Sequence, residues 1–389
     1  MSDLVLDSEP LNRIAEGRKV TKEHAFEIFN LAKDNPSELY NVAAWMRNKH
    51  KKKTVTFSKK AFFNLVNLCR DTCGYCTYKA EPASSKLSMM SKNEVRELAR
   101  LARKYKCTEA LFVTGERPEQ KYAEARKWLK DNGFSSTPEY LVHASEIALS
   151  EGLFPHTNAG NLSKSELAEL KKTNVSMGLM LESASQRLMQ DNMPHHLAPS
   201  KNPKERINVL RNAGELKIPM TTGILLGIGE TPEESIESIF AISALHEQYG
   251  NIQEIILQNF QPKHDTIMRK MPSAEENYFK IMVAMTRVIM PEMNIQIPPN
   301  LSPRSYQRFL EVGINDWGGI SPLTSDYVNP EFAWPEISFV DENCRMAGFE
   351  LKARLPVYPE FISMTDSGLH EKIAQVTDTE GLVKTSYWK

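Results

Sequence analysis

Short apolar runs alternate with longer amphipathic segments along most of the chain, from residue 54 onward. In the longer segments the apolar residues recur every three or four positions, which predicts helices, whereas the short runs predict buried strands. Eight strands are expected, at residues 62–68, 109–114, 153–158, 175–181, 220–227, 254–259, 295–298 and near Asp316. Because each strand is followed by a helix, the pattern favours one closed (βα)8 barrel of the TIM type over two open sheets.

Several predicted helices begin with a Ser or Thr that is followed three residues later by Glu. In this capping box the two side chains accept hydrogen bonds from free N–H groups at the helix N-terminus. Four such pairs occur, namely Ser91 with Glu94, Ser163 with Glu166, Thr231 with Glu234 and Ser273 with Glu276. Each pair follows a predicted strand or its loop, so we expect a helix to begin at each of them.

The two ends of the chain depart from this alternation. Helical spacing at residues 23–33 and 37–50 predicts an N-terminal helical extension over residues 1–53. The barrel is expected over residues 54–336, and residues 337–389 are expected to form a C-terminal helix and tail packed on the barrel. No long linker interrupts the series of strands, so we expect a single barrel domain.

Composition and charge narrow the range of functions. The 389 residues are 41% hydrophobic and 25% charged, which is typical of a globular protein with a filled core. Lys and Arg number 48 and Asp and Glu number 49, so the chain lacks the positive excess that gathers nucleic-acid phosphates. The N-terminus shows no secretory signal, and the longest apolar run, near residues 224–228, is too short to cross a membrane. We therefore expect a cytoplasmic protein that binds neither nucleic acid nor membranes.

Three of the five cysteines, Cys69, Cys73 and Cys76, are clustered in the loop after the first predicted strand. Such clustering in a large intracellular chain indicates metal or redox chemistry rather than disulfides. Three thiolates on a four-iron cluster would leave one iron without a protein ligand. A structural zinc site and an electron carrier are the alternatives, although the first prefers four closed ligands and the second a fourth cysteine. Cys107 and Cys344 stand alone and are expected to be small buried thiols.

The CxxxCxxC spacing is the signature of the radical S-adenosylmethionine (SAM) superfamily, and the chain resembles this superfamily at two further strand ends. Thr114-Gly115-Glu116 resembles a Gly-Gly-Glu motif that contacts the ammonium group of SAM, with Thr114 in place of the first glycine. Residues 223–230 resemble a GxIxGxxE motif that lines the adenine, with Leu225 in place of isoleucine. The resemblance implies a barrel that holds a [4Fe-4S] cluster and SAM.

The resemblance also implies a set of site residues at the ends of the strands. The cluster ligands would be Cys69, Cys73 and Cys76, and the SAM contacts would be Tyr75, Gly115, Glu116, Glu182, Ser183, Gly223, Gly227, Glu230 and Gln258. The expected substrate contacts are His156, Asn158, Asn259, Asn300 and Asp316. The alternatives are a helix-capping carboxylate for Glu182, a structural hydrogen bond for His156 and a turn cap for Asp316. The adjacent His195 and His196 are expected to be exposed loop residues rather than a metal pair.

Longer segments narrow the resemblance to one family. Residues 155–158, 177–183, 217–231, 258–260 and 315–324 are similar to the CofG family, the first subunits of 7,8-didemethyl-8-hydroxy-5-deazariboflavin (FO) synthases, which complete the chromophore of coenzyme F420. The resemblance implies a lyase in which a 5'-deoxyadenosyl radical abstracts hydrogen from 5-amino-5-(4-hydroxybenzyl)-6-(D-ribitylimino)-5,6-dihydrouracil. Ring closure and loss of ammonia would follow. The resemblance also implies a functional partnership with the second subunit, CofH, and with an electron donor.

Three alternatives remain at this point. The coupling subunit CofH is the nearest one, but it usually carries a Gln-Gly-Gly motif where this chain reads Phe-Val-Thr-Gly-Glu-Arg-Pro at residues 112–118. A menaquinone-pathway cyclase is a second alternative within the radical SAM superfamily. A non-enzymatic iron-sulfur or zinc module is a third, from a different class of protein. Metal analysis and a deazaflavin assay distinguish these alternatives.

Overall fold

The computed structural model describes residues 8–389, whose strands and helices alternate along the chain from β1 to β7. The strands are β1 (Thr54–Val66), β2 (Glu109–Thr114), β3 (Phe154–Asn158), β4 (Ser176–Gly178), β5 (Met220–Leu226), β6 (Ile252–Asn259), β7 (Ile295–Gln296), β8 (Asp316–Ile320) and β9 (Glu350–Arg354). The helices are α1 (Glu9–Ala15), α2 (Lys22–Asp34), α3 (Ser37–Lys51), α4 (Lys92–Lys104), α5 (Pro118–Lys121), α6 (Ala123–Asp131), α7 (Thr137–Ser150), α8 (Lys164–Lys171), α9 (Pro203–Glu215), α10 (Pro232–Tyr249), α11 (Glu276–Ile289), α12 (Ile337–Met346) and α13 (Ser367–Val376).

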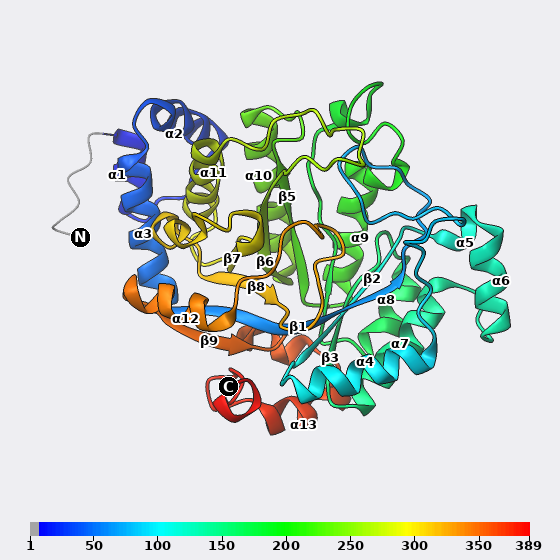
Figure 1. The fold of residues 1–389 in the computed structure, drawn as a ribbon. Coiled ribbons are helices and arrows are strands. Elements are labelled where there is room, and N and C mark those ends of the chain that lie inside the picture. Colours follow the sequence, from blue (N-terminus) through cyan, green and yellow to red (C-terminus); the bar gives the residue numbers. More distant parts are fainter. Residues whose placement is uncertain (1–7) are drawn as a thin grey trace.

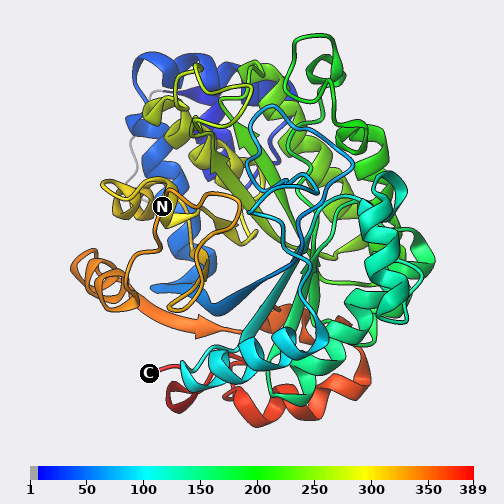
Figure 2. The ribbon, with the colours of Figure 1, turned by 45° about the vertical axis from the view of Figure 1, so that its right-hand side comes forward.

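All strand pairings in the sheet are parallel. The strands are ordered β2-β3-β4-β5-β6-β7-β8-β1, and β1 also pairs with β2. This last pairing closes the first eight strands into a barrel, which confirms the predicted (βα)8 fold. Figures 1 and 2 show α4, α7, α8, α9, α10 and α11 arranged around the outside of the sheet. Alternate side chains of each strand therefore point into the barrel or outward onto the helices.

The first strand is longer than predicted, because β1 begins at Thr54 rather than at residue 62. The C-terminal segment provides the reason, since β9 pairs in parallel with residues Thr54–Ser58 of β1. The sequence pattern predicts only a helix and a tail in that segment, so it misses this ninth strand. Extended structure at the start of β1 thus depends on a partner far along the chain rather than on local apolar spacing.

Three of the four predicted capping boxes are confirmed. The pairs at the starts of α4, α8 and α10 form reciprocal hydrogen bonds between the cap and the Glu three residues later. The fourth prediction is wrong, because Glu275 rather than Ser273 is the N-cap of α11. The hydroxyl of Ser273 instead donates to Gln261 Oε1 at 3.0 Å. The Glu275 carboxylate accepts from two backbone N–H groups of the helix, which leaves no capping position for the serine.

The N-terminal helices pack on one side of the barrel. Helix α2 contacts α10 and α11, and α3 contacts α11; Figure 1 shows α1 next to α2 and α3. Arg47 of α3 is fully buried, and its guanidinium donates to the carbonyl oxygens of Ile314, Lys52 and Thr54. The guanidinium also lies 3.8 Å from the centroid of the Phe349 ring. Arg47 thus joins α3 to the start of β1 and to the loop before β8.

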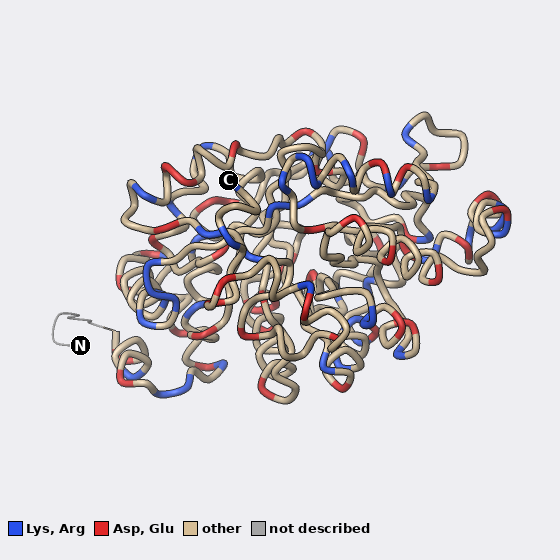
Figure 3. Tube along the Cα trace, turned by 90° about the horizontal axis from the view of Figure 1, so that it is seen from below, with Lys and Arg blue, Asp and Glu red and all other residues tan. Residues whose placement is uncertain are grey.

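Charged side chains of both signs are distributed over the molecule. Figure 3 shows Lys and Arg interspersed with Asp and Glu along the trace, in agreement with the net charge of -1. Within residues 8–389, no helix is long and apolar enough to span a bilayer.

A buried ion-pair network closes the end of the barrel at which the strands begin. Arg354 of β9 contacts Asp316 at 2.7 Å and Glu254 at 3.0 Å, and Tyr358 donates to Glu254 at 2.7 Å. The prediction that Asp316 contacts substrate at the end of a strand is therefore wrong, because this residue begins β8. Its pairing with Thr56 of β1 places it at the opposite end of the barrel.

Replacing Arg354 by Met would remove the cation of this network and leave two buried carboxylates without their counter-ion. We expect the free energy of unfolding to fall by roughly 3–5 kcal/mol. Lys352→Met is the matched control on the same strand, since Lys352 pairs with Glu350 at the surface and contributes about 1 kcal/mol or less. Urea unfolding followed by circular dichroism measures both changes. Equal losses in the two variants would contradict the structural role of Arg354.

Candidate functional site

The three clustered cysteines follow β1 and lie at the rim where the strands end. Cys69, Cys73 and Cys76 are half-buried free thiols that line one cavity of about 320 Å³. The Sγ atom of Cys69 accepts a hydrogen bond from the backbone N–H of Glu116 at 3.2 Å. This bond joins the loop after β1 to the loop after β2.

A second loop, at residues 193–200, holds the cysteine loop in place. The backbone N–H groups of Thr72 and Gly74 donate to the carbonyl oxygens of Leu197 and Pro194, both at 2.8 Å. The carbonyl of Gly74 in turn accepts from the N–H of Met268 at 2.9 Å. The cysteine loop is thus fixed largely by backbone hydrogen bonds, which leaves its thiols free to bind a ligand.

His195 belongs to this second loop and is almost fully buried, so the prediction that it is exposed is wrong. Its Nε2 lies 3.1 Å from the hydroxyl of Tyr75, and the two rings meet edge to face. Burial lowers the pKa of His195 to about 3 and raises the pKa of Tyr75 well above its usual value. Both side chains are therefore neutral near pH 7, and His195 fixes the position of Tyr75. His196 is exposed, as predicted.

Burial also acts on the thiols themselves. It raises the pKa of Cys69 to about 11, and it raises the pKa of Cys73 further. The ammonium of Lys201 opposes the rise in the pKa of Cys73, whereas the neighbouring cysteines add to it. The thiols of Cys69 and Cys73 are therefore protonated at neutral pH, and a metal that binds them must displace protons.

The three thiols are not arranged around one common point. With Zn–S bonds of about 2.3 Å, thiolates that share one zinc ion lie within about 4.6 Å of one another. The three Sγ atoms are not all within 4.8 Å of one another, whereas ligand atoms of the exposed His264, Asp265 and Glu331 are. The free thiols are therefore not already gathered around the position of a single ion.

One cavity brings together most of the predicted site residues. Its lining includes the predicted residues Cys69, Cys73, Tyr75, Cys76, Gly115, Glu116, His156, Asn158, Glu182, Gln258 and Asn259. These residues come from β3 and β6 and from the loops that follow β1, β2 and β4. Closure of the barrel therefore assembles groups that are far apart in the sequence.

Gly115 and Glu116 follow β2 and face the cysteine loop. A Cβ atom at Gly115 would lie 2.0 Å from the carbonyl oxygen of Leu68, so only glycine fits there. Glu116 Oε2 accepts from the N–H of Asn161 at 3.0 Å, while Oε1 is buried without a hydrogen-bond partner among the described residues. Burial raises the pKa of Glu116. Arg70 Nη2 lies 3.9 Å from Oε1, beyond hydrogen-bonding distance, so Oε1 can still accept from a donor in the cavity.

His156 and Asn158 lie two residues apart on β3, so both point into the barrel. His156 Nδ1 lies 2.7 Å from Ser176 Oγ. Burial lowers the pKa of His156 to about 3, so its ring is neutral near pH 7. The sequence also allowed a structural hydrogen bond for His156. This bond is present, and it occupies only one of the two ring nitrogens.

Glu182 and Ser183 follow β4, but only Glu182 lines the cavity. Its Oε1 pairs with Lys201 Nζ at 2.6 Å, and its φ of +64° is a left-handed conformation that residues other than glycine rarely adopt. Helix capping does not explain this carboxylate, because Ser185 caps the next short helix. Ser183 Oγ accepts from the N–H of Ser185 at 3.1 Å and so stabilises the loop rather than facing the cavity.

Three predicted residues after or within β5 also lie outside the cavity lining. A Cβ atom at Gly223 would lie 2.1 Å from the carbonyl oxygen of Ile256, so this glycine allows β5 and β6 to pack closely. Glu230 accepts from the N–H groups of Gly227 and Ile228 at 2.7 and 2.8 Å. The Glu230 carboxylate therefore closes the turn after β5 instead of pointing at a ligand.

The two predicted asparagines near β6 and β7 have different environments. Asn259 lines the cavity, donates to the carbonyl oxygen of Leu301 at 3.1 Å, and has an Oδ1 atom that is buried without a partner within residues 8–389. Asn300 does not reach the lining. Its Nδ2 donates to Asp326 at 3.0 Å and to the carbonyl oxygen of Phe332, so it stabilises the loop after β8.

Several charged residues of the cavity are missing from the sequence prediction, namely Lys60, Glu109, Lys201, Arg206 and Lys263. A signal for Lys60 does exist, because polar residues at positions 54, 56, 58, 60 and 64 alternate with mostly apolar ones in β1. That alternation is typical of a strand with one polar face. Lys201 and Arg206 lie between β4 and β5, where the local pattern says nothing about what the side chains face.

Comparison with known proteins places the chain among described enzymes. Residues 63–242 match the family described as the radical SAM superfamily. The chain is 43% identical over 333 residues to the 7,8-didemethyl-8-hydroxy-5-deazariboflavin synthase of Methanopyrus kandleri, which covers 85% of this chain and 100% of the relative. It is 42% identical over 355 residues to the synthase of the same name from Methanocaldococcus jannaschii, covering 91% and 96%. The FO synthase of Streptomyces avermitilis is 44% identical over 326 residues, which are 82% of this chain and 38% of that relative.

Solved structures with a similar fold are more distant in sequence. The hydrogenase maturase HydG from Carboxydothermus hydrogenoformans superposes with a TM-score of 0.72 at 18% identity, covering 97% of this chain and 87% of that protein. Methylornithine synthase PylB superposes with a TM-score of 0.68 at 17% identity, covering 88% and 97%. These two similarities show a shared fold only, whereas the alignments with the two archaeal synthases cover nearly the full length of those proteins. The chain therefore belongs to the radical SAM superfamily, as a member of its 7,8-didemethyl-8-hydroxy-5-deazariboflavin synthase family.

Proposed function

We propose that the chain is the radical SAM lyase that completes FO from 5-amino-5-(4-hydroxybenzyl)-6-(D-ribitylimino)-5,6-dihydrouracil. The match to whole deazariboflavin synthases, in a chain whose three clustered cysteines face one cavity, carries this proposal. SAM and a [4Fe-4S] cluster are the proposed cofactors. When bound, they would supply the reductive cleavage of SAM to methionine and a 5'-deoxyadenosyl radical that abstracts hydrogen from the substrate.

Cys69, Cys73 and Cys76 are the proposed ligands of the cluster. Three thiolates leave one of its four irons without a protein ligand, which is the position that SAM would take. The N–H of Glu116 that donates to Cys69 Sγ would stabilise the thiolate form. Lys201 adds positive charge near Cys73 and favours the same form.

Free polar atoms near the cysteines support the binding of SAM. Glu116 Oε1 and Thr114 Oγ1 are buried without hydrogen-bond partners in the described chain, so they are suited to accept from the ammonium group of SAM. Tyr75 packs with Leu225 and Phe260 beside the cysteine loop, which offers an apolar contact for the adenine. These two groups would fix opposite ends of SAM and so orient the bond that breaks.

The remaining proposed SAM contacts act in two ways. Glu182 and Gln258 line the cavity and are proposed to bind SAM directly. Gly115 lets the loop after β2 approach the cysteine loop, as the short distance to Leu68 requires. We propose that Ser183, Gly223, Gly227 and Glu230, which lie behind the lining, shape the SAM site through the backbone that they stabilise.

The substrate would occupy the rest of the cavity. His156, Asn158 and Asn259 line it and are the proposed contacts, and Asn259 Oδ1 has no partner within residues 8–389. Walls that exclude water would protect a radical from side reactions and hold one C–H bond in place. The chain's own contribution is thus mainly to bind, orient and shield.

We further propose that CofH supplies the substrate and that a separate electron donor reduces the cluster. The greater length of the FO synthases of Streptomyces avermitilis and Streptomyces coelicolor supports the proposal of a second catalytic unit. This chain matches only 38% and 39% of their lengths, so these relatives have room for a further domain. In an organism with separate chains, the second activity would come from a partner protein.

Activity is tested directly with anaerobically reconstituted protein, SAM, a reductant and the tyrosine–uracil adduct. We expect a fluorescent deazaflavin together with 5'-deoxyadenosine and methionine, because the chain matches whole FO-forming synthases. Fluorescence and liquid chromatography measure these products. Cleavage of SAM with the adduct returned unchanged would contradict the proposed reaction and favour another radical SAM enzyme.

Substitution of one cysteine tests the cluster. We expect anaerobically purified wild-type protein to hold about four irons per chain, and Cys73→Ala to lose them while its circular dichroism spectrum is unchanged. Cys107→Ala is the matched control, because Cys107 is a fully buried free thiol away from the cavity, as predicted for both isolated cysteines. Iron analysis and SAM cleavage give the readout. Retained SAM cleavage in Cys73→Ala, or equal iron loss in the control, would refute the ligand assignment.

A further inference from the structure

The cavity extends well below the cysteine loop and ends in a group of polar side chains. Lys60, Glu109, His156 and Gln296 line this far end, and each residue is less than 9% exposed. Lys60 pairs with Glu109 across β1 and β2, and His156 lies on the next strand, β3. Three neighbouring strands therefore present a cation, an anion and an imidazole to the same space.

Lys60 is held in the cavity beside Glu109 but forms no close ion pair with it: burial lowers the pKa of Lys60, and the charge of Glu109 opposes this shift. Nζ lies 4.5 Å from the centroid of the Trp334 ring and 5.6 Å from that of Phe62. A Cβ atom at Gly319 would lie 2.8 Å from Nζ, so the glycine makes room for this side chain. Among residues 8–389, no carboxylate lies within 4.0 Å of Nζ and no acceptor lies within hydrogen-bonding distance of it. Nζ is not among the fully buried polar atoms without a partner, so it is accessible from the cavity, where a ligand oxygen would stabilise the ammonium form.

Nearby carboxylates do not meet this need, because two of them are already satisfied. Glu254 accepts from Arg354 and Tyr358, and Asp326 accepts from Asn300. The Glu109 carboxylate faces the cavity and has no hydrogen-bond partner in the described part of the chain. Lys60 and Glu109 thus remain as two open charges of opposite sign side by side.

His156 adds a neutral acceptor to these two charges. The hydroxyl of Ser176 donates its single hydrogen to the carbonyl oxygen of Pro356 at 2.6 Å. Ser176 Oγ must therefore accept from His156 Nδ1–H, which leaves Nε2 without a proton. Nε2 lies on the cavity side, beside Gly178, where a Cβ atom would come within 2.8 Å of it.

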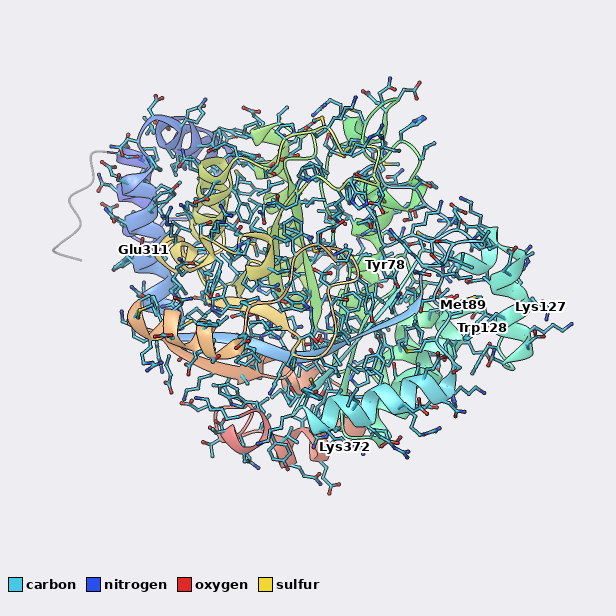
Figure 4. The ribbon with its side chains drawn as sticks, in the orientation of Figure 1. Tyr78, Met89, Lys127, Trp128, Glu311 and Lys372 are labelled. Carbon is cyan, nitrogen blue, oxygen red and sulfur yellow. The ribbon has the colours of Figure 1, made fainter. Side chains whose placement is uncertain are left out.

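This polar end lies far from the cysteines. Lys60 lies six positions before Val66, the last residue of β1, which corresponds to roughly 20 Å along the strand. Between the two ends, Tyr78, Leu111, Val113 and Val328 line the cavity with apolar surface. Figure 4 labels Tyr78, which lies in the middle of the molecule, whereas Lys127 and Trp128 lie at its edge on α6. A ligand that spans the cavity would need a reactive end, an apolar middle and a polar tail.

We propose that Lys60, Glu109 and His156 form a polyol subsite that binds the ribityl chain of the substrate. This inference rests on the proposed function, from which the ribityl-bearing substrate is taken. The reacting part of that substrate must lie near the cysteine end, so its remote ribityl chain lies at the far end. Each hydroxyl of a polyol both donates and accepts, which suits a cation, an anion and a neutral acceptor in a row. Binding energy gained from this unreactive tail would orient the reacting end.

The test combines Lys60→Met with a substrate that lacks the ribityl chain. We expect Lys60→Met to raise the KM for the intact adduct about tenfold, as the loss of one charge-assisted hydrogen bond predicts. With the truncated adduct the variant and the wild type should have the same KM. Iron content and circular dichroism check that Lys60→Met still folds and assembles its cluster.

Lys59→Met is the matched control, since Lys59 directly precedes Lys60 in β1 and its Nζ donates to the Trp388 carbonyl oxygen at 2.9 Å. We expect this control to behave as wild type with both substrates. A KM in Lys60→Met within twofold of wild type, or an equal rise with intact and truncated adduct, would overturn the subsite. If Lys60→Met loses iron or structure, Glu109→Gln carries the same test with the same two outcomes.

Equilibrium binding separates failure of the subsite from failure of the proposed function. The probes are ribityl-diaminouracil and the same diaminouracil without its ribityl chain, titrated calorimetrically into the holoenzyme. If the wild type binds the ribityl probe more tightly than the probe without the ribityl chain, and Lys60→Met binds the two equally, the result would support the subsite. This holds even if no deazaflavin forms. Deazaflavin formation by a wild-type protein that shows no such preference would overturn the subsite and leave the proposed function intact.

Discussion

Strand β1 hydrogen-bonds to β2 and β8 at once, and the whole site depends on this double pairing. β2 meets β1 from Lys60 onward, while β8 meets it at Thr56–Lys59, so the two contacts close the sheet. In a closed parallel barrel all strands end at one rim. The cysteine loop after β1, Glu116 after β2 and Glu182 after β4 therefore face a common cavity. Without closure, these groups would be spread along one edge of an open sheet and would not surround a common cavity.

The interior of the barrel is unusually polar for a fold whose core is commonly filled by branched apolar side chains. Arg354 neutralises Asp316 and Glu254 where the strands begin, so that end is a finished structural network. Lys60 and Glu109 lie closer to the ligand space and have no such partners among the described residues. Buried charged side chains thus stabilise the end of the barrel where the strands begin. Nearer the cysteines, they offer charges that a polar ligand can bind.

The local sequence pattern was sufficient to predict the order of the strands and the cysteine loop, because apolar periodicity and close cysteine spacing are properties of short segments. The local pattern did not predict the features that depend on a partner residue far along the chain. β9 extends the start of β1, His195 is buried by Tyr75, and Asp316 begins β8 because Thr56 pairs with it. Lys60 illustrates the intermediate case. Its alternating polar face is visible in the sequence, but the cavity that it faces requires the closed barrel.

Electron paramagnetic resonance of the reduced, anaerobically reconstituted protein tests the central claim that three cysteines hold a cluster with one iron open to SAM. The account predicts the signal of a single reduced [4Fe-4S] cluster, whose g values shift when SAM is added, because SAM binds the iron that lacks a protein ligand. A spectrum that is unchanged by saturating SAM, or a protein that binds zinc instead of iron, would contradict it.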